Sequence, residues 1–162
     1  MTGVQTCALP ISGLPSSGQV GAAVKAARTR LGVQEVGSSN RGQRVDKWQQ
    51  RFGMIGQPWC GIFAGVVLQK AGVKGVDSSI ASVAAIEANA RGRRGPFRGW
   101  ASPDQAEAGD LLVTRKGAHV TVVERVDRDG TLHIIGGNQT GGVTRGSYKP
   151  GEVYGVAKVK YR

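Results

Sequence analysis

Three side chains of this sequence could together perform nucleophilic catalysis: Cys60, His119 and Asn138. Apolar residues recur at helical spacing from Trp59 onward, and Pro58 fits the first turn of such a helix. Cys60 would then lie among unpaired backbone N–H groups at the positive end of the helix dipole, where thiolate is favoured over thiol. A small buried cysteine that only packs is the alternative interpretation.

His119 is the candidate base, because it lies at the start of a predicted strand and can reach a helix end. Asn138 follows two glycines, where the return strand of a hairpin ends close to the strand that carries His119. In this arrangement the imidazole takes the thiol proton, and the Asn138 carbonyl orients the ring.

Other residues have secondary roles in this interpretation. We expect Trp59 and Gln57 to bind substrate, and Gln57 could donate to an oxyanion, although the Cys60 backbone N–H is the surer donor. His133 could replace His119 as base if the strand register were shifted, but a solvent-facing histidine is the simpler interpretation. The sequence lacks paired-ligand spacings such as Cys-x-x-Cys or His-Glu-x-x-His, so we expect no metal and no cofactor.

Two acidic residues receive structural interpretations. Glu124 lies on the strand face opposite His119, so we expect a solvated charge there and not a third catalytic residue. Asp110 is typical of a residue that caps or turns the chain before a strand.

The order of elements predicts helices first and strands later. Helical spacing of apolar residues covers approximately residues 20–31, 45–52, 59–73 and 82–90. Strand signals cover residues 111–114, 118–126, 131–135 and 152–161, with a hairpin turn at 127–130. Residues 91–100 are rich in Arg and Gly and predict an exposed basic loop. We therefore expect a two-layer α+β domain, with the Cys60 helix packed on an antiparallel sheet.

Composition indicates one globular domain, since the chain has 162 residues with 40% hydrophobic content. Its formal net charge of +11 predicts attraction to a polyanion such as nucleic acid, anionic lipid or an anionic cell wall. The arginines around Phe97 and Trp100 have the composition of a single-strand nucleic-acid platform, but a solvated loop is the simpler interpretation. No apolar run has the length of a transmembrane helix.

The N-terminal residues are treated separately. Residues 1–11 resemble an in-frame translation of a common sequencing-adapter oligonucleotide, so we expect residues 1–18 to be an artefactual or linker segment. With Cys7 set aside, Cys60 is the only cysteine, which excludes an intramolecular disulfide.

Several short motifs occur together in one order along residues 19–160. They are Asn40-Arg41-Gly42 with Val45-Asp46, Pro58-Trp59-Cys60 with Phe63 and Ala71-Gly72-Val73, Gly109-Asp110, Gly117-Ala118-His119-Val120, and Gly137-Asn138-Gln139. In this order and spacing they resemble the CHAP family, the cysteine, histidine-dependent amidohydrolases and peptidases of the papain-like and NlpC-like superfamily. The resemblance makes residues 19–162 a CHAP-like catalytic domain.

The resemblance implies a papain-like fold and a peptidoglycan hydrolase, an amidase or endopeptidase that works through a cysteine thioester. It makes Cys60 the nucleophile, His119 the base and Asn138 the orienting residue. Many relatives carry Glu two residues before this Asn, whereas this chain has Gly136, so Asn138 would orient the ring alone. The alternative is a catalytically inactive basic module that binds cell wall or nucleic acid.

The resemblance also implies peptidoglycan as partner, with anionic wall polymers held by the positive surface, and it disfavours nucleic acid. We expect a monomer without a membrane span. It would act in the periplasm, outside the cell or in association with a phage.

Overall fold

The computed structural model describes residues 18–114 and 119–162. The expected N-terminal segment, apart from Gly18, therefore lies outside the described residues. Gly117 and Ala118 of the motif that ends at Val120 lie outside them as well. The helices are α1 (Gly18–Arg28), α2 (Gln43–Gln50), α3 (Cys60–Lys70) and α4 (Val83–Arg91), with the 3₁₀ turns η1 (Ser78–Ala81), η2 (Pro103–Gln105) and η3 (Pro150–Glu152).

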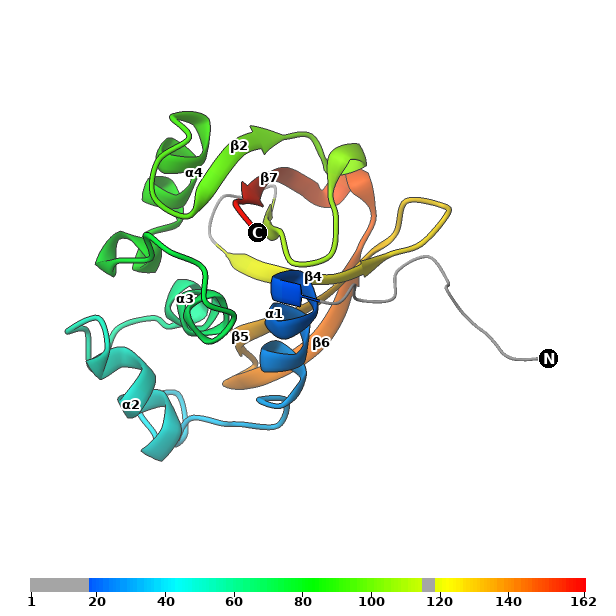
Figure 1. Cartoon of the computed structure of the whole chain (residues 1–162). Coiled ribbons are helices and arrows are strands. Elements are labelled where there is room, and N and C mark those ends of the chain that lie inside the picture. Colours follow the sequence, from blue (N-terminus) through cyan, green and yellow to red (C-terminus); the bar gives the residue numbers. More distant parts are fainter. Residues whose placement is uncertain (1–17, 115–118) are drawn as a thin grey trace.

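The strands form one antiparallel sheet in the order β2-β7-β3-β4-β5-β6. They are β2 (Phe97–Ala101), β3 (Leu111–Thr114), β4 (Val120–Val126), β5 (Leu132–Gln139), β6 (Gly142–Tyr148) and β7 (Val153–Val159). Helix α3 contacts β4 and β5, α1 contacts α3 and β4, and α4 contacts β2 (Figure 1). The predicted α+β architecture with a helix on an antiparallel sheet is confirmed.

Helix α3 is the centre of the core, because it is apolar on every side. All residues from Cys60 to Leu68 are buried, as expected for a helix without a polar face. A Cβ atom on Gly61 would lie 2.1 Å from the Ile80 carbonyl oxygen, and one on Gly65 would lie 2.8 Å from Ile80 Cγ2. The two glycines therefore let η1 lie directly against α3.

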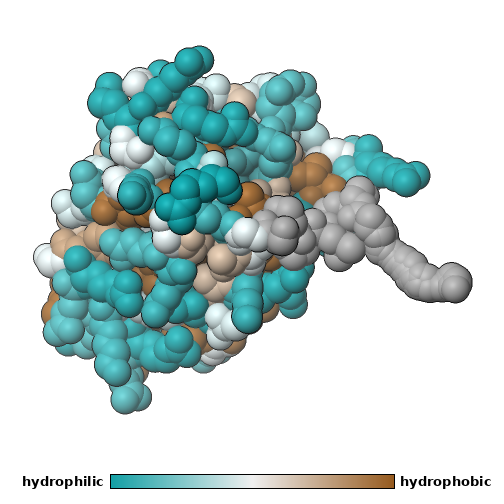
Figure 2. All heavy atoms as spheres, in the orientation of Figure 1, coloured by the Kyte–Doolittle hydropathy of each residue, from teal (hydrophilic) through white to brown (hydrophobic). Residues whose placement is uncertain are grey.

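The outer surface is predominantly polar. On the face shown in Figure 2, hydrophilic side chains dominate and hydrophobic ones appear in small, separate areas. No helix in residues 18–114 and 119–162 is long and apolar enough to cross a membrane.

The expectation of an exposed loop over residues 91–100 is wrong in its second half. Residues from Phe97 onward form β2, which pairs with β7, and Phe97 is 1% exposed. The Arg91 guanidinium lies over the Trp100 ring, with its Cζ atom 5.1 Å from the ring centroid. The ring also contacts the Tyr154 ring and lies against the backbone at Gly155. These contacts occupy part of the ring, and the stacking platform considered for nucleic acid receives no support from them.

The expectation that Glu124 is a solvated charge is also wrong. The pairing of β4 with β5 shifts between Val123 and Arg125, which breaks the regular alternation of side chains. Glu124 is 5% exposed and forms ion pairs of 2.6 Å with Arg28 and 3.0 Å with Arg145.

Asp110 does turn the chain, since its carboxylate accepts a hydrogen bond from the Glu107 backbone N–H. It is also buried, and its Oδ2 atom lies 2.6 Å from Lys158 Nζ. Asp110 therefore joins the segment before β3 to the end of β7, a tertiary role that its position in the sequence does not indicate.

Candidate active site

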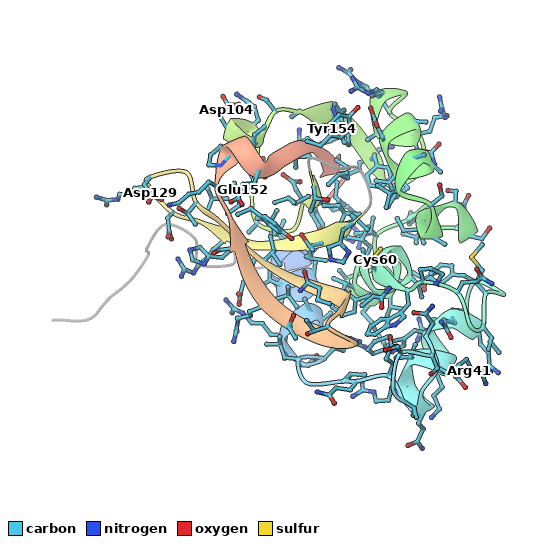
Figure 3. All side chains as sticks on the ribbon, turned by 180° about the vertical axis from the view of Figure 1, so that it is seen from behind. Arg41, Cys60, Asp104, Asp129, Glu152 and Tyr154 are labelled. Atoms are coloured by element: carbon cyan, nitrogen blue, oxygen red, sulfur yellow. The ribbon has the colours of Figure 1, made fainter. Side chains whose placement is uncertain are left out.

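Helix α3 begins at Cys60, so the cysteine lies in the first turn as the sequence predicts, whereas Pro58, expected in that turn, precedes the N-cap residue Trp59. Trp59 precedes its first turn, and the Cys60 side chain is buried where α3 meets the sheet (Figure 3). The sulfur accepts hydrogen bonds from the backbone N–H groups of Gly61 and Val120. The helix start and the first residue of β4 therefore converge on the thiol.

His119 lies immediately before β4 and is partly buried. Its carbonyl oxygen accepts a hydrogen bond of 3.1 Å from the Thr114 backbone N–H, which ties it to the end of β3. Its imidazole forms a hydrogen bond with the Cys60 side chain. The structure thus brings together the two residues predicted as nucleophile and base.

The two groups shift each other's protonation equilibrium. Burial acts to raise the pKa of the Cys60 thiol, but the hydrogen bonds from His119, Val120 and Gly61 and the His119 charge outweigh it and hold this pKa below that of an ordinary thiol. Burial acts to lower the pKa of His119, but the contact with Cys60 and a hydrogen bond to Gln139 hold it above its ordinary value. Both shifts favour a thiolate–imidazolium pair.

Gln139, and not the predicted Asn138, contacts the imidazole ring of His119. His119 Nε2 lies 3.1 Å from Oε1 of Gln139. Asn138 has a positive φ of 58°, and the pairing of β5 with β6 shifts between Gly136 and Gln139. This irregular strand end turns the Gln139 side chain back toward the histidine. Regular alternation from the sequence does not predict that turn.

Trp59 does not have the exposed position that substrate binding requires. Its side chain is fully buried, its Nε1 donates a hydrogen bond of 2.9 Å to Glu35 Oε1, and its ring lies 6.0 Å from that of Trp48. The substrate contact predicted for Trp59 is therefore wrong in this structure. Its role is to anchor the start of α3.

Gln57 lines a cavity of about 690 Å³ that opens beside the start of α3. The other lining residues are Gly53, Met54, Ile55, Pro58, Ser78, Ser79, Ala81 and Ser82. None of them carries a charge, so the cavity would accept uncharged parts of a ligand.

His133 lies away from this site. Its Nε2 atom is 2.7 Å from Oδ2 of Asp127 at the hairpin between β4 and β5. Figure 3 shows Asp129 of the same hairpin far from Cys60. The alternative in which His133 is the base therefore receives no support.

Sequence reasoning missed Gln49, which holds the chain before the nucleophile. Its side chain is fully buried and its Nε2 donates to the carbonyl oxygens of Asn40, at 2.9 Å, and Gln57, at 2.7 Å. Its Oε1 accepts a hydrogen bond from the Gly56 backbone N–H at 3.2 Å. A glutamine in a short polar helix gives no sign of such a contact, so only the structure reveals it.

Within the part of the chain that the structure describes, no three His, Cys, Asp or Glu residues gather in a way that could hold a metal ion.

A cysteine at the start of a buried helix, facing a histidine on an antiparallel sheet, defines the papain-like class of α+β folds. The CHAP domain model matches residues 52–138, more than half of the chain, and the chain belongs to the CHAP family. CHAP domains are generally cysteine, histidine-dependent amidohydrolases or peptidases, which indicates a function of the peptidoglycan hydrolase or amidase type. No curated protein and no solved structure matches the chain.

Proposed function

We propose that residues 19–162 form a catalytic domain that cleaves amide bonds of bacterial peptidoglycan, with Cys60 as nucleophile and His119 as general acid and base. The observation that carries this proposal is the hydrogen-bonded pair of Cys60 and His119 at the start of α3, with the pKa of the thiol lowered and that of the imidazole raised. Such opposed shifts in one contact are typical of an activated thiol.

In the first half of the reaction, the Cys60 thiolate attacks the carbonyl carbon of the scissile amide. The Cys60 backbone N–H at the helix start donates to the developing oxyanion. The imidazolium of His119 then protonates the leaving amine, the C–N bond breaks, and a thioester remains on Cys60.

In the second half, neutral His119 accepts a proton from a water molecule as that water attacks the thioester carbonyl. The C–S bond breaks, the carboxylic acid product leaves, and the thiolate–imidazolium pair is restored. Because Nε2 of the ring faces Gln139, Nδ1 is the nitrogen that faces the thiol and moves the protons.

Two features support peptidoglycan as the substrate beside the family membership. The net charge of +11 favours association with a wall that carries anionic polymers. The uncharged cavity is lined by Gln57 and Pro58 of the segment that leads to Cys60, and it suits neutral parts of a stem peptide.

Digestion of purified peptidoglycan by the full chain tests this proposal, with the soluble fragments identified by mass spectrometry. We expect fragments with new amine and carboxyl ends, and we expect Cys60→Ala to release none. Gln50→Ala is a suitable control, because Gln50 is exposed on α2. If several wall types bind the chain without any release, the binding module without catalysis becomes the better interpretation.

A further inference from the structure

We propose that Gln139 is the positioning residue for His119, and that it acts from the space that Gly136 leaves empty. The inference rests on the proposed function and adds to it the group that sets the tautomer of the base. Its evidence is the packing around Gly136 and the direction in which the Gln139 amide points.

The Gln139 carboxamide occupies the place where a side chain at position 136 would lie. A Cβ atom on Gly136 would be 2.9 Å from Gln139 Cδ and 3.0 Å from its Oε1. It would also be 2.7 Å from Cγ2 of Thr121, a fully buried residue. A larger residue at position 136 and the observed Gln139 conformation therefore exclude each other.

The direction of the Gln139 amide is fixed from the side opposite the histidine. Its Nε2 lies 3.0 Å from the Thr144 carbonyl oxygen and 2.9 Å from Thr144 Oγ1. A carbonyl oxygen can only accept, so the NH₂ end of the amide must face Thr144 and the oxygen must face His119. Because Gln139 Oε1 can only accept, His119 Nε2 must carry a hydrogen.

The neutral form of His119 is thereby held with its hydrogen on Nε2 and with Nδ1 free to accept the thiol proton. A connected path of hydrogen bonds runs from Thr144 through Gln139 and His119 to Cys60. The orienting group is uncharged, so it sets the tautomer without the added stabilisation of imidazolium that a carboxylate would give.

The test compares Gln139→Ala, Gln139→Glu and Asn138→Ala in the full chain, with Gln50→Ala as control. One readout is the pH dependence of iodoacetamide alkylation, measured on the peptide that contains Cys60. The other is the pH dependence of kcat and KM for peptidoglycan cleavage.

We expect Gln139→Ala to lower kcat about 10-fold or more, with a smaller change in KM, and to move Cys60 alkylation to higher pH. Gln139→Glu keeps an acceptor for His119 Nε2, and its carboxylate should raise the pKa of His119, so the fall in rate at high pH occurs later. It loses the donor to the Thr144 carbonyl oxygen, so we expect activity between that of the wild type and that of Gln139→Ala. Unchanged pH profiles in folded Gln139→Ala, or a shift in Asn138→Ala alone, would overturn the proposal.

If Gln139→Ala does not fold, Gln139→Glu and Thr144→Val decide, because Thr144→Val keeps the glutamine and removes one of its anchors. We expect Thr144→Val to shift alkylation in the direction expected for Gln139→Ala, and wild-type profiles in both variants would refute the inference. Alkylation does not depend on the substrate. If the variants shift the pH midpoint of Cys60 alkylation but the wild type does not cleave peptidoglycan, the proposed function is refuted and the role of Gln139 stands.

Discussion

Replacement of Gln49 by methionine tests whether one buried amide holds the chain that leads to the nucleophile. Methionine has nearly the same length and volume, so the change removes hydrogen bonds with little change in packing. Three backbone groups, the carbonyls of Asn40 and Gln57 and the Gly56 N–H, lose their partner. At about 1 kcal/mol for each hydrogen bond, and more where the orphaned group stays buried, we expect a loss of about 3 to 5 kcal/mol.

Urea unfolding followed by tryptophan fluorescence measures this loss. With an m-value of about 2 kcal/mol/M, the unfolding midpoint should fall by about 2 M. Gln50→Met is the matched control, because Gln50 is the next residue of α2 and is exposed. If Gln49→Met and Gln50→Met unfold within about 0.5 kcal/mol of each other, the buried amide does not hold this loop.

Three further outcomes follow from the same structure. Gly61→Ala should lower the melting temperature and reduce the free energy of unfolding by about 1 to 3 kcal/mol, because the new Cβ would lie 2.1 Å from the Ile80 carbonyl oxygen. Gly99→Ala is the control, because a Cβ at Gly99 would meet no atom within 4 Å. Equal melting temperatures of the two variants would contradict the clash. The rate of cleavage should rise with pH through the lowered pKa of Cys60 and fall through the raised pKa of His119, and a plot of kcat/KM against pH without a fall at high pH would contradict the pair. Binding to purified walls should weaken as salt rises, because the net charge is +11, and salt-independent sedimentation with the walls would count against electrostatic attachment.

Local signals made part of the site predictable from the sequence. A proline and an apolar stripe of helical period predicted a helix start near Cys60, and the strand pattern predicted His119 close to the start of the strand that the structure has as β4, which begins one residue later at Val120. These features depend on a few neighbouring residues. Their meeting in space then follows from packing a helix on an antiparallel sheet.

The remaining features depend on contacts between distant segments. Gln139 reaches the histidine because the pairing of β5 with β6 is irregular, and Glu124 is buried because β4 contains a similar shift. Strand β2 forms where Phe97 pairs with Val159 of β7, although its own residues resemble a loop. The Trp59 ring contacts Trp48 of α2, and no short motif around Cys60 indicates this contact.

The proposed pairing of Cys60 with His119 is tested most directly by the pH dependence of Cys60 alkylation in the full chain and in His119→Ala. In the wild type, half-maximal reactivity should occur below the pH of an ordinary thiol, because His119 and two backbone N–H groups stabilise the thiolate. In His119→Ala the midpoint should move to higher pH, since burial then opposes ionisation with less compensation. An ordinary thiol midpoint in the wild type, or the same midpoint in both proteins, would contradict an activated nucleophile at this site.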